Sequence, residues 1–473
     1  MRCGESLRIK IAHSSGKIEL TVALHSQVAA ELTRLEDGLA FQNLGKAAAL
    51  GRAKLRHATK IVLVHLLSPG PIRHRISQWP GLTKPFSMVN REYHRFIHDL
   101  SGFEFPNRFA CREDVPDNNQ QEIVSRLIDY YWRMKSSPEM SRALLDIWAE
   151  ISKKHAAFST ALERRDVDTV SHFLLNVCNT PLAIGFENSI LNSKAHQHFL
   201  ELNVVDKFLA LAESLGCLPV QCPEQGKWGY QSIDVDNLYE QIQARIPFDL
   251  TAPAAGGGSY GLRTKGGIFT ERNLQAVSTA LRVHRLLEGA PRKVVAEIGG
   301  GIGALTYYLA KAGMDATYLF DLPIVSILQG YFLMKSHGPE QVCLWGEEAH
   351  QARINVCPWW ALETSPDKLF TLVVNQDSMP EIDQDISLNY LNLIKKKATD
   401  YFLSINQEGQ APSIKNGRQA VVYDLVDAVG GFRRLSRERD WMREGYVAET
   451  YQIAPLQASY ESVSASHGSR SAD

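Results

Sequence analysis

The residues best suited to chemistry lie between Arg292 and Pro323, where a glycine-rich stretch is flanked by two acidic residues. The apolar run 294–296 predicts a buried strand that ends at Glu297. Residues 316–320 predict a second strand, which ends at Asp321. This order of strand, glycine loop, helix and strand is typical of nucleotide-binding α/β proteins.

The glycines between these strands indicate a close approach of the backbone to a ligand. Gly299, Gly301 and Gly303 follow Glu297 at every second position. Glycine permits a tight turn and leaves space where any Cβ would touch the bound group. An acidic residue at the end of the second strand, here Asp321, can accept hydrogen bonds from ribose hydroxyls. The stretch therefore predicts a site for a nucleoside cofactor, with a ligand-free strand–helix turn as the alternative.

Two classes of cofactor fit this loop. The spacing Gly299-x-Gly301-x-x-Ala304 is typical of dinucleotide sites, in which a pyrophosphate lies at a helix N-terminus. Counted from Glu297, the same residues resemble the first motif of class I S-adenosylmethionine methyltransferases. A carboxylate would repel a pyrophosphate but attract the cationic methionine portion of S-adenosylmethionine. We therefore expect S-adenosyl-L-methionine, with Glu297, Gly299, Gly301, Gly303, Asp321, Leu322 and Asn375 as the cofactor-binding residues.

The composition narrows the class of protein. A chain of 473 residues with 44% apolar and 22% charged residues suggests a soluble protein of two or three domains. The net charge of −1 gives no electrostatic case for nucleic acid as a partner. The seven cysteines form no CxxC pair, which favours reduced thiols and a cytoplasmic location. No run of 18 apolar residues occurs, so we expect no integral membrane segment.

The fold class that we expect is α/β, with a seven-stranded Rossmann-like sheet preceded by a mainly α-helical domain. Two strand-like runs near the C-terminus, FRRLSRE and YVAETYQI, predict a closing antiparallel pair. In the first segment, residues 46–75 carry seven Lys or Arg and no Asp or Glu, which fits a solvated basic helix or one lying on anionic lipid. The expected segments are a basic helical segment 1–85, a helical domain 86–250, a glycine-rich linker 251–268, a cofactor-binding domain 269–460 and a disordered tail 461–473.

The linker contains a candidate substrate contact. Residues 251–268 hold six glycines, which is typical of a hinge. Tyr260 is embedded among them, so a loop that closes over substrate is the second interpretation.

Polar residues follow the predicted fourth and fifth strands, 368–375 and 401–405. Methyl transfer to a hydroxyl requires an aligned acceptor and a group that removes its proton. Asp377 and Glu381 are the candidate bases, with a pKa raised by partial burial. The alternative is that Asp377 caps the following helix and Glu381 is an exposed residue of its first turn. Ser378 and Asn406 are candidate substrate contacts.

The C-terminal half contains the motifs EIGGGIG (297–303), FDLP (320–323), GYFL (330–333), LWGE (344–347), PW (358–359), NQDSMPE (375–381), SINQE (404–408) and REGYVAE (443–449). In this combination it resembles the sugar O-methyltransferase family of bacterial polysaccharide and natural-product gene clusters. The resemblance implies a class I fold, S-adenosylmethionine and a small hydroxylated acceptor such as a sugar. A non-sugar acceptor, a regulatory subunit without turnover and a homodimer all remain compatible with it. A divalent metal held by Asp377, Glu381 and Glu408 is an option that no spacing requires, and we predict none.

Overall fold

The computed structural model describes residues 9–14, 17–22, 96–100, 107–141, 148–187, 194–222, 224, 233–348, 352–410 and 418–454. The chain divides into two compact units, residues 1–90 and 91–473. In the first unit, β1 (Ile9–Ser14) and β2 (Lys17–Val22) pair as an antiparallel hairpin. The basic segment 46–75 and the tail 461–473 lie outside the described residues.

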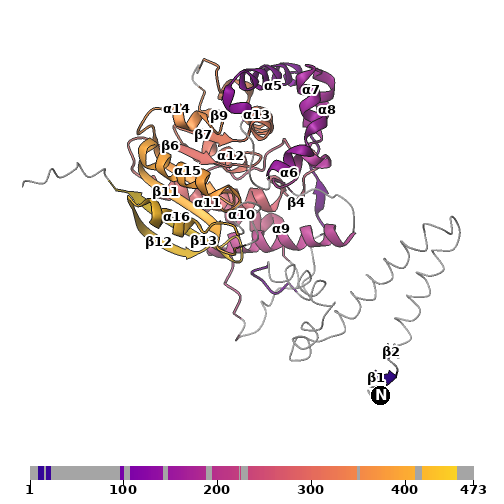
Figure 1. The fold of residues 1–473 in the computed structure, drawn as a ribbon. Coiled ribbons are helices and arrows are strands. Elements are labelled where there is room, and N and C mark those ends of the chain that lie inside the picture. Colours follow the sequence, from indigo (N-terminus) through magenta and orange to yellow (C-terminus); the bar gives the residue numbers. More distant parts are fainter. Residues whose placement is uncertain are drawn as a thin grey trace, which may run out of the picture. The chain divides into compact units, whose positions relative to one another are not determined.

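The second unit is built on one eight-stranded sheet (Figure 1). Its strand order is β12-β13-β11-β10-β6-β7-β9-β8. β13 runs antiparallel to both of its neighbours, and the remaining pairs of adjacent strands are parallel. The strands are β6 (Val294–Ile298), β7 (Ala316–Asp321), β8 (Val342–Leu344), β9 (Ile354–Pro358), β10 (Phe370–Gln376), β11 (Ala398–Gln407), β12 (Phe432–Arg439) and β13 (Tyr446–Ile453).

The sheet confirms the closing antiparallel pair and corrects the number of strands. We expected seven strands, and the sheet has eight, because β8 and β9 both lie beyond β7. β8 is only three residues long and pairs with β9 alone. Such a short edge strand leaves little periodic pattern in a sequence.

Helices cover both faces of the sheet, because the strand side chains alternate between two cores. Val295 of β6 belongs to the core that contains α11, α12 and α13. Its neighbours Val294 and Ala296 belong to the opposite core, with α14, α15 and α16. The helices are α11 (Glu271–Leu286), α12 (Ala304–Lys311), α13 (Pro323–His337), α14 (Ala361–Thr364), α15 (Gln384–Lys397) and α16 (Val422–Val429).

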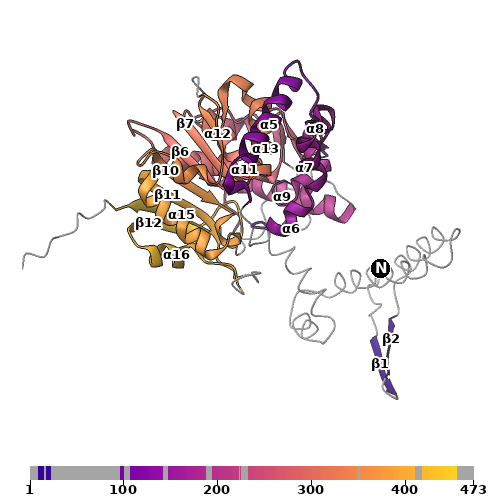
Figure 2. The same ribbon diagram turned by 45° about the horizontal axis from the view of Figure 1, so that its top comes forward.

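The helical residues before the sheet share its first core. Figures 1 and 2 both place α5 beside α13. Gly330 of α13 permits this contact, since a Cβ there would lie 2.8 Å from Leu127 Cδ2 of α5. The described helices of this region are α5 (Gln120–Lys135), α6 (Trp148–Lys153), α7 (Ala156–Glu163), α8 (Val167–Leu175), α9 (Lys194–Ser214) and α10 (Val235–Gln243).

The glycine-rich stretch 251–268 is structured, unlike the hinge or closing loop that we expected. It contains β4 (Tyr260–Thr264) and part of β5 (Gly267–Phe269), which form a three-stranded sheet with β3 (Phe109–Cys111). Its glycines serve close packing, because a Cβ on Gly261 would lie 2.1 Å from the carbonyl oxygen of Phe269. Composition alone does not separate this use of glycine from flexibility.

Candidate active site

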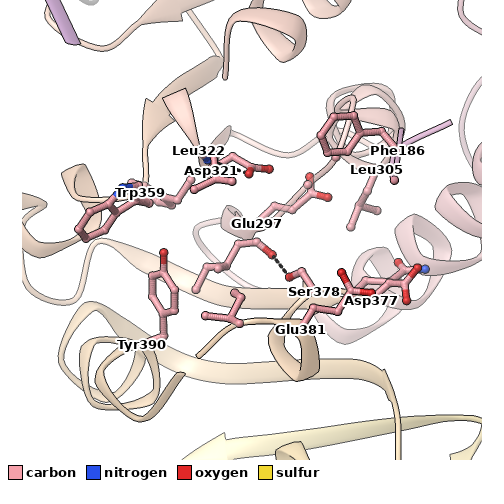
Figure 3. A pocket seen from close by; sticks show the side chains of 18 of the residues that line it. Phe186, Glu297, Leu305, Asp321, Leu322, Trp359, Asp377, Ser378, Glu381 and Tyr390 are labelled. Carbon is pink, nitrogen blue, oxygen red and sulfur yellow. Dashed lines mark hydrogen bonds between the residues drawn. The ribbon is translucent and has the colours of Figure 1, made fainter. Parts of the chain in front are cut away.

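A cavity of about 770 Å³ opens at the carboxyl ends of β6, β7 and β10. This is the edge at which parallel α/β sheets bind ligands, because the loops there diverge. Figure 3 shows Trp359 and Tyr390 at one end of the cavity, Glu297 near its middle, and Phe186 and Asp377 at the other end. We call these the aromatic end and the Asp377 end.

The glycine loop forms the floor between the two ends. Gly299 has a φ of +73° and Gly301 a φ of +57°, a region that favours glycine. A Cβ on Gly299 would lie 2.2 Å from Ser378 Oγ, so this position has no room for a side chain. Gly303, with a φ of +96°, is the N-cap of α12 and does not line the cavity.

We expect Gly299→Ala to lower the free energy of unfolding by about 2–4 kcal/mol, from left-handed strain plus the clash with Ser378. Gly289→Ala is a matched control, because Gly289 has the same φ of +73° and a Cβ at that position would have no atom within 4 Å. The control should lose only about 1–2 kcal/mol. Urea unfolding of both variants measures the difference, and equal losses would contradict the assigned clash.

Two carboxyl groups face the loop without a cationic partner among the described residues. The buried Glu297 accepts a hydrogen bond from Thr306 Oγ1 at 2.7 Å. The half-buried Asp321 accepts from the backbone N–H of Leu322 and from Gln329 Nε2, both at 2.8 Å. Loss of hydration on burial raises the pKa of Glu297 to about 8 and that of Asp321 to about 7. A ligand that brings positive charge or hydroxyl donors would stabilise the ionised forms of both groups.

The aromatic end is suited to a flat ring. Leu322, Trp359 and Tyr390 line the cavity there, beside Asp321 (Figure 3). The backbone N–H of Trp359 donates to the carbonyl oxygen of Asp321 at 2.8 Å, which fixes the loop after β9 against the end of β7. Aromatic and aliphatic walls of this kind stack on planar ligands.

The Asp377 end contains an ion cluster. Asp377 follows β10 with a φ of +63°, a strained conformation for a residue other than glycine. Its Oδ2 accepts hydrogen bonds from Arg272 Nη1 at 2.7 Å and from Arg443 Nη1, and its Oδ1 accepts from the Tyr446 hydroxyl. These contacts link α11, the end of β10 and the loop before β13.

The raised pKa expected for Asp377 is wrong. Burial would raise the pKa, but the guanidinium groups of Arg443 and Arg272 and the hydroxyl of Tyr446 lower it to about 2. An acid of this strength stays ionised at neutral pH and has little tendency to take a proton.

The other predicted site residues separate into two groups. Ser378 and Glu381 line the cavity, as do Glu297, Gly299, Gly301, Asp321, Leu322 and Asp377. Asn375 and Asn406 lie behind the wall, where Asn375 Nδ2 donates to the carbonyl oxygen of Ile298 at 3.0 Å and Asn406 Nδ2 donates to Asn375 Oδ1 at 3.0 Å. They hold the ends of β6, β10 and β11 together.

Tyr260, the candidate substrate contact, does not line this cavity. Its side chain is buried and its hydroxyl donates to Glu201 Oε1 at 2.6 Å. Because Tyr260 lies in β4, its side chain packs within the protein instead of covering a bound molecule.

Several cavity residues were missed by sequence reasoning. Arg443 and Tyr446 lie within the motif REGYVAE, and Trp359 within the motif PW, so a local signal existed for these three. Arg272 and Phe186 carry no local signal, because only the fold brings α11 and the residues after α8 to this edge.

No group of three or more His, Cys, Asp or Glu side chains in the described part of the chain is placed to hold a metal ion. Glu408, the third acid of the metal option, instead accepts from Arg437 at 2.7 Å. None of the described helices is long and apolar enough to span a bilayer.

Comparison with known proteins found no matching family model and no matching curated protein. Among solved structures, the chain is similar to a 1,6-didemethyltoxoflavin N1-methyltransferase from Burkholderia thailandensis with bound S-adenosylhomocysteine, with 19% identity, 38% of this chain and 79% of the other covered, and a TM-score of 0.29. It is also similar to a magnesium protoporphyrin IX methyltransferase from Synechocystis with bound S-adenosylmethionine, with 13% identity, 39% and 80% covered, and a TM-score of 0.27. An N-methyltransferase from Bradyrhizobium japonicum, in complex with S-adenosylhomocysteine, matches with 15% identity, 38% and 85% covered, and a TM-score of 0.28.

Proposed function

We propose that the protein is an S-adenosylmethionine-dependent O-methyltransferase that acts on a hydroxyl of a sugar or another small hydroxylated molecule. The observation that carries the proposal is the pair of carboxyl groups with raised pKa, Glu297 and Asp321, beside a glycine loop that has no room for a Cβ at Gly299. A cationic nucleoside would supply the positive charge and the hydroxyl donors that stabilise the ionised forms of both carboxyl groups.

The residues of the cavity fit the parts of this cofactor in order. The aromatic end, with Leu322, Trp359 and Tyr390, suits adenine, and Asp321 suits the ribose hydroxyls. Glu297 suits the cationic methionine portion. When bound, S-adenosylmethionine supplies a methyl carbon attached to a sulfonium sulfur, and a hydroxyl oxygen can displace the sulfur from that carbon.

Glu381 is the base that we propose. It lines the cavity after β10, as Asp377 does, but Asp377 has a pKa of about 2 and accepts hydrogen bonds through both oxygens. In our proposal Glu381 takes the hydroxyl proton as the bond from the hydroxyl oxygen to the methyl carbon forms and the bond from that carbon to sulfur breaks, which leaves S-adenosylhomocysteine. Asp377 instead positions Arg272, Arg443 and Tyr446 at the end of the cavity where the acceptor would lie.

Cofactor affinity should depend on pH, because the bound cation favours the ionised forms of Glu297 and Asp321. With pKa values of about 8 and 7, the free protein holds protons on these groups at pH 6 and must release them on binding. We expect S-adenosylmethionine to bind at least about tenfold more weakly at pH 6 than at pH 8, since one pKa unit corresponds to about 1.36 kcal/mol. Calorimetry in two buffers of different ionisation enthalpy would detect the proton release, and binding without release would contradict the assigned protonation.

Glu297 and Asp321 should also make the free energy of unfolding of the free protein depend on pH. Their raised pKa values mean that the native state holds protons that the unfolded chain releases, so they stabilise the fold at acidic pH. Their contribution is lost as the pH rises through about 7 and 8. Saturation with S-adenosylmethionine should reduce this loss, because the bound cation favours the ionised forms of both groups.

The proposal is tested by acceptor-dependent turnover. The full chain is incubated with S-adenosylmethionine and a panel of monosaccharides, glycosides and phenols, and mass spectrometry follows S-adenosylhomocysteine and the methyl ether. We expect at least one hydroxylated acceptor to give both products. If S-adenosylhomocysteine binds but no acceptor of any class is methylated, a regulatory subunit without turnover becomes the better explanation.

A further inference from the structure

We propose that Arg272 and Arg443 form an anion subsite at the Asp377 end of the cavity, so that the acceptor carries a carboxylate or phosphate group. This inference rests on the proposed function, because it names the class of acceptor that the same cavity would take. The main observation behind it is that both guanidinium groups bind the same carboxylate, Asp377.

Both guanidinium groups converge on a single carboxylate oxygen. Arg272 Nη1 and Arg443 Nη1 contact the same Oδ2 of Asp377, while Oδ1 accepts from the Tyr446 hydroxyl. Asp377 thus supplies one negative charge to two positive charges. Glu271, with its Oε1 3.7 Å from Arg272 Nε, and the nearby Glu187 partly compensate the charge of Arg272, so Arg443 is the stronger candidate anchor.

The remaining donors of the two arginines are available to a ligand. In the described part of the chain, each guanidinium makes one hydrogen bond, although it carries five N–H donors. Both arginines line the cavity, and their side chains are 26% and 24% exposed. Because both residues line the cavity, an anion bound at this end would accept from N–H groups that Asp377 leaves unbonded.

The orientation of Arg443 is fixed before any ligand arrives. Its Cζ lies 3.7 Å from the centroid of the Tyr446 ring, and the stacked ring restrains the plane of the guanidinium. A planar, oriented guanidinium is the group that binds carboxylate and phosphate oxygens in a bidentate manner. Preorganisation of this kind lowers the entropy cost of binding an anion.

The acidic residues that would repel an anion are spread along the cavity. Asp321 lies near the aromatic end and Glu297 near the middle, whereas Asp377 lies at the opposite end (Figure 3). Asp440, near Arg443, is largely buried, and burial raises its pKa. Among the described residues that line the cavity, Arg272 and Arg443 are the only Arg or Lys, so an anion would meet positive charge at the Asp377 end. Glu381 lies beside Asp377 and adds negative charge there (Figure 3).

The test titrates inorganic phosphate and, separately, malonate into the full chain saturated with S-adenosylhomocysteine, at constant ionic strength. The variants are Arg443→Gln, Asp377→Asn and the control Arg433→Gln. Arg433 lies on the edge strand β12, and its exposed side chain donates to Gln452 of β13. Asparagine suits the positive φ of residue 377 and keeps its shape. Comparison of the two anions distinguishes a phosphate group from a carboxylate.

We expect wild type and Arg433→Gln to bind one of the two anions equally, and Arg443→Gln to bind it about tenfold more weakly. Asp377→Asn should bind it several-fold more tightly, because it removes the competing negative charge; a merely structural role for Asp377 would not produce this gain. The inference is overturned if neither anion binds the wild type, if Arg443→Gln binds like the wild type, or if Asp377→Asn binds no more tightly.

The experiment distinguishes failure of the proposed function from failure of the anion subsite. If S-adenosylhomocysteine does not bind, the methyltransferase proposal fails, and the anion titrations without it still decide whether the arginine pair forms a subsite. If S-adenosylhomocysteine binds but displaces the anion, the subsite is misplaced and the inference is overturned while the function stands.

Discussion

The variant Glu381→Gln is expected to lose about 100-fold or more of kcat while it keeps the wild-type affinity for S-adenosylhomocysteine. The amide cannot take the acceptor proton, and a positioned base contributes about 10²- to 10⁴-fold to such reactions. The measurement uses the best acceptor found in the turnover panel, with kcat and KM determined separately. A loss confined to kcat would indicate a role in the chemical step and not in binding.

Glu363→Gln is the matched control for this variant. Glu363 lies in α14 and also lines the cavity, but it has no role in the proposed chemistry. It should keep kcat within about threefold of the wild type, as expected for a substitution away from the reacting atoms. If Glu381→Gln behaves like Glu363→Gln, Glu381 is not the base.

Asp321→Asn is expected to weaken S-adenosylhomocysteine binding by about 100-fold. The carboxylate would accept charge-assisted hydrogen bonds from ribose hydroxyls, and hydrogen bonds to charged groups contribute about 1.5–3 kcal/mol. The asparagine can still accept from the Leu322 N–H, so the loop should keep its conformation. Calorimetric titration of the purified variant gives the change in Kd directly.

The control for this change lies at the other end of the same strand. Asp315, just before β7, is exposed and accepts from the backbone N–H of Lys293 at 2.7 Å. Asp315→Asn should leave the Kd for S-adenosylhomocysteine unchanged. Equal effects of the two substitutions would remove Asp321 from the binding site.

The sequence predicted the parts of the fold that follow from local pattern. The strand, glycine loop and strand around Glu297 and Asp321 are present as expected, because buried parallel strands are continuous apolar runs and the loop needs glycine at Gly299. Thr270 directly precedes α11, a local signal for a helix cap, and it accepts from the backbone N–H of Asn273 at 3.3 Å. Each of these features is determined by residues that lie close together in the sequence.

The features that sequence reasoning missed depend on contacts between distant residues. The low pKa of Asp377 arises from Arg443 and Arg272, which are far from it in the chain and meet it only in the folded protein. The glycines around Tyr260 resemble a linker in the sequence, whereas in the structure they permit close strand packing. The Asp377 end of the cavity could therefore not be derived from local pattern.

The central claim is that this cavity binds S-adenosylmethionine and not a dinucleotide. Parallel calorimetric titrations of the full chain with S-adenosylhomocysteine and with NAD at pH 8 test it most directly. We predict a single site with a Kd on the order of micromolar for S-adenosylhomocysteine, and no heat of binding for NAD. Binding of NAD without binding of S-adenosylhomocysteine would contradict it.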